Sequence, residues 1–437
     1  MTWRSRRKND SPPKAGGARK PSAKLWGIAA GGAAVVTATG VIVSLATGNP
    51  TAPAPASSAL AHSAPPVSEG GVREVDGVPV GYPHTQAGAK AAAANYTTVS
   101  GSAGFLTNKE LRHRAVSVMA AQGTAATATE KADHAAAGAV SALRGDDSKV
   151  SAKQAISRTG VLSAHVLGFD AHGAMVRLWT TTVRGSAAGH ATPKAGFQSV
   201  TVTLTWESND WKLKESASST GLVSPIDARQ ASNVTSDFAG YVSAAAEDPV
   251  LSGAAGQDGF PTPYGHNEQG TRAAAVSATM LYGDPRFFTD EDWRHRMLKA
   301  TAAPSVLHSV ISDTDSTARL VMENRGVGAD GKTADGSELI TRTAALATRA
   351  ISHSDQAASV ELWTASVGGV AGKDETQRPQ IAFLRMTVDL LWEDGTWKTT
   401  AVTPSEPLVP SPPAMQEADS ADSFADVGGA SNAPATA

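Results

Sequence analysis

The chain has 437 residues, a formal net charge of −3 and no cysteine. Its length suggests about two or three domains of about 150 residues each. The absence of cysteine excludes disulfides, thiol nucleophiles, iron–sulfur clusters and cysteine-containing zinc sites. The low net charge argues against a protein that binds nucleic acid directly.

Charge is distributed unevenly along the chain. Residues 1–24 contain eight basic side chains and one acidic side chain, whereas residues 25–47 contain no charged side chain. As a helix, the uncharged segment rises about 1.5 Å per residue, which is enough to cross a hydrocarbon core of about 30 Å. Because the basic residues precede it, we expect a cytoplasmic tail over 1–24, a transmembrane helix over 25–47 and extracytoplasmic domains in the cell membrane. A cleaved signal peptide is the alternative.

Two further segments have compositions that disfavour a packed core. Residues 48–76 contain the Pro- and Ala-rich stretch NPTAPAPASSALAHSAPPVSEGG, which spans 49–71, and predict a disordered linker. Residues 412–437 contain four acidic side chains and no lysine or arginine, which predicts an acidic disordered tail. The folded part of the chain should therefore lie between these two segments.

An internal repeat dominates the folded part. The segment GVPVGYPH at 77–84 returns as GFPTPYGH at 259–266, and eight of the twenty positions from Gly77 onward are identical when Gly77 is aligned with Gly259. Later blocks that contain tryptophan recur in the same order, with only a few inserted residues between them. Four blocks in one order predict two homologous domains, over 77–225 and 259–411, with a connector over 226–258.

Each copy begins with helical spacing and ends with strand-like alternation. In the first copy we expect a helix over 108–121, capped by Thr107, and a second helix near 126–143. In the second copy the corresponding cap is Thr289, and a further helix is expected near 304–312. Alternating apolar residues then predict strands at 175–183, 199–206, 360–367 and 381–392, and turns at 208–210 and 394–396. This order predicts an α+β domain.

The hairpins Trp206–Lys212 and Trp392–Lys398 share the pattern W-x-x-x-x-W-K. Helices followed by an antiparallel sheet that ends in such a hairpin resemble the NTF2-like cone fold. One N-terminal anchor before two such domains resembles the TcpC/VirB8-like bitopic membrane proteins of Gram-positive actinobacterial conjugation and type IV secretion systems. The resemblance implies an α+β fold class, with an N-terminal single transmembrane helix followed by tandem duplicated NTF2-like domains.

A first group of repeated side chains precedes the helices of each copy: Tyr82 and His84, and Tyr264 and His266. A functional interpretation has the phenol and the imidazole line a pocket of the cone and transfer protons. The structural interpretation has the histidine pack or cap a corner while the tyrosine fills the core. We favour the structural one, because no carboxylate is repeated beside the pair.

A second repeated group is Arg-His-Arg on the first predicted helix of each copy: Arg112, His113, Arg114, Arg294, His295 and Arg296. Successive helical residues point about 100° apart, so these three should not converge on one point. His113 is expected to face solvent, and Arg114 and Arg296 are expected to pair with carboxylates such as Glu207 or Glu393. The alternative is a partner-binding surface centred on His113 and His295.

Six repeated tryptophans are more typical of a core than of a ligand platform: Trp179, Trp206, Trp211, Trp363, Trp392 and Trp397. The chain lacks a P-loop, a dinucleotide fingerprint, H-E-x-x-H and G-x-S-x-G. We therefore expect no catalytic residue, no metal ion and no cofactor.

These expectations favour a non-catalytic, single-pass scaffold or assembly protein of the cell envelope, in a conjugation or type IV secretion-like apparatus. Its expected partners are the membrane, other envelope or secretion proteins and further copies of the chain in a homo-oligomer, without direct contact to nucleic acid. One alternative is an envelope-anchored enzyme or small-molecule-binding protein that uses the cone pockets. An extracytoplasmic ligand sensor is disfavoured, because the segment 1–24 before the anchor is too short for a signalling domain.

Overall fold

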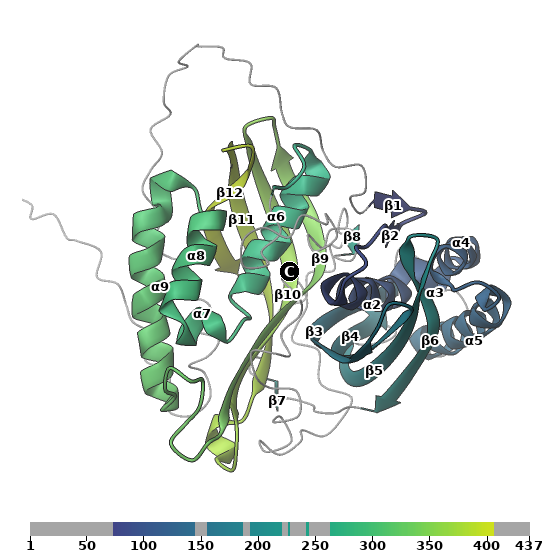
Figure 1. Ribbon diagram of the computed structural model, residues 1–437, viewed down its shortest axis with the longest axis horizontal. Helices are drawn as coiled ribbons and strands as arrows, with labels where there is room; N and C mark the ends of the chain where they lie inside the picture. The colour runs from purple at the N-terminus through teal and green to yellow at the C-terminus, as the bar shows by residue number, and fades with distance from the viewer. Residues whose placement is uncertain are drawn as a thin grey trace, which may run out of the picture. The chain divides into compact units, whose positions relative to one another are not determined.

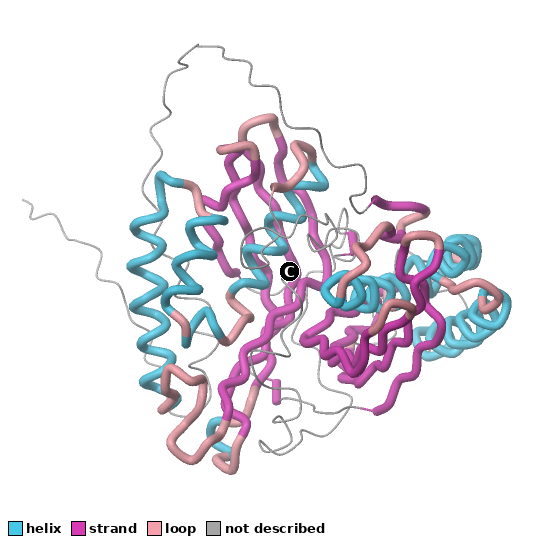
Figure 2. The backbone as a smooth tube through the Cα atoms, viewed as in Figure 1, coloured by secondary structure: helices cyan, strands magenta, loops and turns pink. Residues whose placement is uncertain are grey.

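A computed structural model of the chain describes residues 73–144, 155–186, 193–220, 226–227, 242–243 and 263–405. All of these residues lie within one compact unit, Gly31–Ala437. In both copies of the repeat the helices precede the strands of the main sheet, as the colouring of Figure 1 shows, and Figure 2 distinguishes the helices from the strands. The predicted basic tail, transmembrane helix and acidic tail lie outside the described residues.

The fold class predicted from the sequence requires a correction. Within the described ranges, no helix is both long enough and apolar enough to cross a membrane. The segment 25–47, to which the transmembrane helix was assigned, lies outside those ranges. The structure shows antiparallel sheets and helices without a membrane-spanning helix in its described part.

The first copy combines a small hairpin, four helices and a four-stranded sheet. The hairpin consists of β1 (Arg73–Val75) and β2 (Val78–Val80), and β1 falls inside the range expected for the linker. The helices are α2 (Gln86–Ser100), α3 (Ala103–Thr107), α4 (Lys109–Met119) and α5 (Ala125–Arg144). The antiparallel sheet has the order β3 (Ala155–Phe169), β4 (Gly173–Ser186), β5 (Lys194–Glu207) and β6 (Asp210–Thr220).

The second copy repeats the order of four helices and four main strands. Its helices are α6 (Glu268–Leu281), α7 (Arg286–Thr289), α8 (Glu291–Thr301) and α9 (Pro304–Arg325). Its main strands are β9 (Glu338–His353), β10 (Ala357–Ala371), β11 (Gln380–Glu393) and β12 (Thr396–Ser405), with a short 3-10 helix η4 (Glu375–Gln377) before β11. Two short strands of the expected connector join this sheet: β7 (Ile226–Asp227) is parallel to β11, and β8 (Val242–Ser243) is antiparallel to β9.

The hairpin turns confirm the predicted turn signals. Ser208 and Asn209 have φ angles of 52° and 59°, and Asp394 and Gly395 have φ angles of 52° and 73°. Two consecutive residues with positive φ form the turn type whose twist matches that of a two-residue β-hairpin. In both copies the turn therefore brings the paired tryptophans of the hairpin opposite each other.

The helix caps differ from the prediction by one residue. Asn108 and Asp290 cap α4 and α8, and each accepts a hydrogen bond from the backbone N–H three residues later. Thr107 instead ends α3, where its hydroxyl donates to the carbonyl of Ala103 at 2.7 Å. The short helix before α4 was not foreseen, and it shifts the start of α4 by one position. The predicted helix near 304–312 extends to Arg325 as α9.

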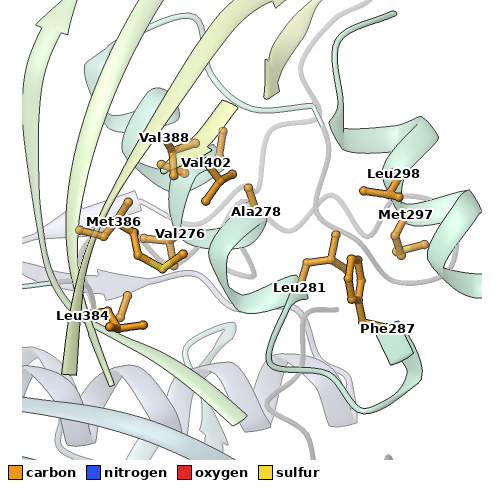
Figure 3. Close-up of a cluster of buried hydrophobic side chains, with 14 of the residues drawn as sticks. Val276, Ala278, Leu281, Phe287, Met297, Leu298, Leu384, Met386, Val388 and Val402 are labelled. Carbon is orange, nitrogen blue, oxygen red and sulfur yellow. The ribbon is translucent and has the colours of Figure 1, made fainter. Parts of the chain in front are cut away.

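Each copy has its own apolar core between helices and sheet. In the first copy, Ala89, Ala92 and Ala93 of α2 are completely buried, because small side chains let this helix approach the sheet closely. Figure 3 shows the equivalent core of the second copy, where side chains of α6 face those of β11 and β12, and those of α8 lie beyond Leu281 and Phe287. These cores hold the first helix of each copy against the last strand.

A third cluster contains matching residues of both copies. It includes the tryptophans Trp179 and Trp363 and the phenylalanines Phe197 and Phe383. All four side chains are buried, and the two tryptophans confirm their predicted place in a core. Of the other repeated tryptophans, Trp211 and Trp397 are buried, whereas Trp206 and Trp392 are only partly buried.

Candidate functional site

The repeated arginine of α4 binds a carboxylate that sequence analysis did not identify. Arg112 is buried, and its Nε and Nη2 atoms each lie 2.7 Å from Oδ1 of Asp133 on α5. Its Nη1 donates to the carbonyl oxygens of Phe105 and Leu106 at 2.9 and 3.2 Å. One guanidinium therefore joins α3, α4 and α5.

The second copy repeats this arrangement. Arg294 is buried, and its Nε and Nη2 donate to Oδ1 of Asp315 on α9 at 2.9 and 2.6 Å. Its Nη1 donates to the carbonyl oxygen of Phe287 at 2.8 Å. We call Arg112, His113 and Asp133, and likewise Arg294, His295 and Asp315, the Arg-His-Asp clusters.

The two histidines also bind the aspartates. Nε2 of His113 lies 3.0 and 2.9 Å from the two carboxylate oxygens of Asp133, and Nε2 of His295 lies 2.9 and 3.0 Å from those of Asp315. The expectation that successive residues of α4 could not converge was wrong for Arg112 and His113. The backbone angle keeps them apart, but a carboxylate on the neighbouring helix lies within reach of both side chains.

The electrostatics of the clusters keep both aspartates ionised. Hydrogen bonds from His113 and Arg112 lower the pKa of Asp133. Burial by itself raises the pKa of Asp315, but hydrogen bonds from Arg294 and His295 outweigh it, so the pKa is lowered. A carboxylate with a lowered pKa is a poor proton acceptor, so these clusters are better suited to holding helices or a cation than to general base catalysis.

A signal for the missed aspartates was present in the sequence. Asp133 and Asp315 occupy equivalent positions in the same gap-free alignment that pairs the two Arg-His-Arg motifs. The predicted partner of Arg114 was wrong, since its Nε lies 3.4 Å from Asp76 Oδ1, and Glu207 accepts the backbone N–H of Gln122 at 2.8 Å. The pairing of Arg296 with Glu393 stays a prediction.

The histidine that follows Tyr82 lies in an aromatic stack. The ring of His84 is stacked on Trp206, with 4.0 Å between centroids and 6° between planes, and its Nε2 lies 3.1 Å from the carbonyl oxygen of Ala171. Tyr82 is buried, and its backbone N–H donates to Asp210 Oδ1 at 3.0 Å. In this copy both residues have structural partners.

The second copy has the same histidine–tryptophan stack, but a different side chain accepts the hydrogen bond from the tyrosine backbone. His266 is stacked on Trp392 at 3.9 Å and 12°, and its Nε2 lies 2.6 Å from the carbonyl oxygen of Asp355. The backbone N–H of Tyr264 donates to Thr396 Oγ1 at 3.0 Å, where the first copy uses Asp210. The geometry of the corner is therefore retained although an aspartate is replaced by a threonine.

The repeated lysine of each hairpin binds the end of a helix. Nζ of Lys212 donates to the carbonyl of Val118 at 2.9 Å, and Nζ of Lys398 donates to that of Ala300 at 2.6 Å. Both acceptors lie in the last turn of their helix, where carbonyl groups lack helical partners and favour a positive charge. The W-x-x-x-x-W-K pattern thus ties the hairpin to α4 and α8.

One group of side chains in the described residues has the spacing of metal ligands. The ligand atoms of Glu291, His295 and Asp315 all lie within 4.8 Å of one another. An open hollow of about 630 Å³ adjoins them and is lined in part by Glu291, Arg294 and Asp315. The second Arg-His-Asp cluster could therefore hold a cation that reaches it from solvent.

Comparisons with known proteins give a match to a family model and a weak similarity to a solved structure. Residues 45–243 match a family model described as "Domain of unknown function (DUF8175)". No curated protein matches the chain. A solved structure described as "Ntf2 like protein involved in plasmid conjugation" is similar with a TM-score of 0.18 and 8% identity, over 72% of this chain and 94% of that one. A TM-score this low does not establish a common fold.

Proposed function

We propose that the chain is a non-catalytic assembly protein, and that its setting is a conjugation or type IV secretion-like apparatus. This proposal rests on the contacts that the repeated histidines and arginines make within the fold. His84 and His266 are stacked on tryptophans and bonded to backbone carbonyls, while Arg112 and Arg294 bind aspartates of a neighbouring helix. Repeated groups with such partners support a structural role for the repeat.

Exposed apolar side chains support a partner-binding role. Leu167, Phe169 and Met175 lie at one end of the β3–β4 hairpin and are 47%, 41% and 42% exposed. Ile351, which is 55% exposed, occupies the position in β9 that corresponds to Leu167. Phe169 pairs with Ala174, the residue before Met175, so Phe169 and Met175 lie on opposite faces of the hairpin. This end of the hairpin therefore offers apolar contacts on both faces to a partner protein.

The enzyme alternative needs a pocket between the helices and the sheet, and the hollow found there is small. The larger open hollow of about 630 Å³ is lined by residues of α7, α8, α9 and the segment after α9, and not by the sheet. A hollow lined by Leu281, Leu298 and Val402 among α6, α8, α9 and β12 has a volume of about 50 Å³. This volume suits one or two water molecules, whereas small-molecule pockets usually measure about 300–1,000 Å³. The hollow is therefore better explained as a packing defect than as a substrate pocket.

The conjugation setting comes from the resemblance of the sequence and is tested by a transfer assay. Deletion of the gene in its native cells should abolish plasmid transfer, and the wild-type chain should restore it. A Leu167→Asp/Met175→Asp variant with an unchanged thermal melt should fail to restore transfer, because both substitutions place charge on the exposed apolar end of the hairpin. Unchanged transfer after deletion would contradict the proposal.

The same transfer assay distinguishes an assembly protein from an enzyme. A His84→Gln/His266→Gln variant keeps a flat polar side chain at each stack and removes the imidazole that an acid–base enzyme would need. We expect it to restore transfer once its melt shows that it is folded. A folded variant that fails to restore transfer while still binding its partners would favour the enzyme alternative.

A further inference from the structure

The two Arg-His-Asp clusters differ at one neighbouring position. Lys109 begins α4 in the first copy, and Glu291 begins α8 at the equivalent position of the second copy. In the first copy, Nζ of Lys109 lies 4.0 Å from Oδ2 of Asp133. The first copy therefore places a covalently attached cation beside the carboxylate, whereas the second copy places a carboxylate there.

This exchange changes the local charge by two units. With neutral histidines, Lys109, Arg112 and Asp133 sum to +1, whereas Glu291, Arg294 and Asp315 sum to −1. The two carboxylates of the second copy lie close together, and like charges at such distances destabilise each other. A bound cation would remove that repulsion in the second copy. The first copy needs no such ion, because the ammonium group of Lys109 already supplies a positive charge there.

The hydrogen bonds of Asp315 leave one oxygen available for an ion. Both contacts from Arg294 fall on Oδ1, at 2.9 and 2.6 Å, and Nε2 of His295 lies 2.9 Å from Oδ1 and 3.0 Å from Oδ2. It is the corresponding Oδ2 of Asp133 that Lys109 approaches in the first copy. The oxygen beside the lysine in the first copy thus corresponds to the oxygen of Asp315 that lies away from the arginine in the second copy.

We propose that Glu291, His295 and Asp315 bind one divalent transition-metal ion, for which zinc is the natural probe. Carboxylate oxygens and a neutral imidazole nitrogen bind zinc at about 2.0–2.2 Å, and three protein ligands leave a fourth position for water. His295 presents the Nε2 lone pair when its hydrogen is on Nδ1, so the ion replaces the hydrogen bond between His295 and Asp315. The ligand atoms, now within 4.8 Å of one another, need only small side-chain rotations to surround an ion.

The adjoining hollow gives the ion access and room for its water ligand. Its volume of about 630 Å³ is bounded by α8, α9 and the segment after α9, and Glu291 and Asp315 are part of its lining. Arg294 also lines it and stays bound to Asp315 Oδ1, where it orients the carboxylate. Such outer partners typically tune the affinity of a metal site.

The decisive experiment is calorimetric titration of the metal-free full chain with zinc. The wild-type chain should bind one equivalent, and Glu291→Lys, which copies the first cluster, should lower the affinity by about tenfold or more. Glu291 is exposed and its replacement removes the repulsion with Asp315, so the thermal melt of the metal-free variant should lie at or above that of the wild type. His308→Gln, which removes an exposed histidine elsewhere on α9, is the matched control and should bind zinc as the wild type does.

The reverse exchange tests the role of charge. Lys109→Glu gives the first cluster the same ligand set as the second, so the stoichiometry should rise from one zinc ion to two. Replacement of zinc by cobalt should give a visible absorption band in the wild type that Glu291→Lys loses. The proposal is overturned if the wild type and Glu291→Lys bind zinc equally, if neither binds it, or if Lys109→Glu leaves the stoichiometry unchanged.

Discussion

The indole N–H of Trp211 donates a hydrogen bond to the carbonyl oxygen of Pro83 at 2.9 Å. This contact joins the last hairpin of the first copy to the chain that leads into α2, across 128 residues. In the second copy, Trp397 donates in the same way to the carbonyl of Gly265 at 3.0 Å. The repeated tryptophan is therefore both a core side chain and the donor that closes each copy.

Replacement of Trp211 should separate these two roles. Trp211→Phe keeps much of the apolar volume and removes the indole donor, while the Pro83 carbonyl still accepts from the backbone N–H of Thr85 at 2.8 Å. We therefore expect a loss of about 0.5–1.5 kcal/mol in the free energy of unfolding. Trp211→Ala also opens a cavity and should cost about 3–5 kcal/mol. Chemical denaturation measures both variants. Equal stabilities of Trp211→Phe and the wild type would show that the hydrogen bond contributes nothing.

The glycine in the first turn of α2 should be irreplaceable because of the same carbonyl group. A Cβ atom on Gly88 would lie 2.1 Å from the Pro83 oxygen, so Gly88→Ala should destabilise the chain by about 1–3 kcal/mol or more. Gly138 of α5 is the matched control, since its Cβ would meet no atom within 4 Å. Gly138→Ala should stabilise the chain by about 0.4–1 kcal/mol. Thermal melts that moved in the same direction for both variants would contradict this assignment.

The hairpin turn of the first copy should be improvable. Asn209 has a φ of 59°, where the second copy has Gly395. Glycine adopts positive φ without strain, so Asn209→Gly should raise the free energy of unfolding by about 0.5–1 kcal/mol. Ser208→Val places a β-branched residue at a φ of 52° and should lower it. A lower denaturation midpoint for Asn209→Gly than for the wild type, or a higher one for Ser208→Val, would contradict the positive φ angles of this turn.

Acid should weaken the Arg-His-Asp clusters. The pKa values of Asp133 and Asp315 lie below their usual value of 3.8 in the folded chain, so the unfolded chain binds protons first as the pH falls. The stabilisation from these carboxylates is thus complete above that value and is lost as the pH falls below it toward the folded-state pKa. An Asp133→Asn/Asp315→Asn variant should be less stable near pH 7 and should show a shallower decline in acid. Parallel acid-denaturation curves for the variant and the wild type would contradict the linkage.

Much of the secondary structure could be predicted because its causes are local. Alternation over 199–206 predicts a strand from the pattern of apolar side chains alone, and the turn at Asp394 and Gly395 follows from residues that tolerate positive φ. The cap of α4 was misplaced, because the preceding helix α3 is only five residues long and has no periodic pattern to reveal it.

The candidate site was predicted only in part. Sequence comparison of the two copies identified Arg112 and His113, but helical geometry suggested that they point apart. They meet at Asp133, which comes from α5 and lies 21 residues after Arg112. A pattern within one helix does not show what a neighbouring helix supplies, so the partner becomes visible only when the helices are packed.

The sequence by itself determined that one unit is used twice, since four blocks recur in one order with few insertions between them. It also determined that helices precede strands in each copy, because apolar periodicity is a local property of the chain. Only the tertiary structure decided that His84 stacks on Trp206, that Arg112 joins three helices, and that Glu291 faces the second cluster. These relationships join residues distant in the chain, and packing rather than local preference brings them together.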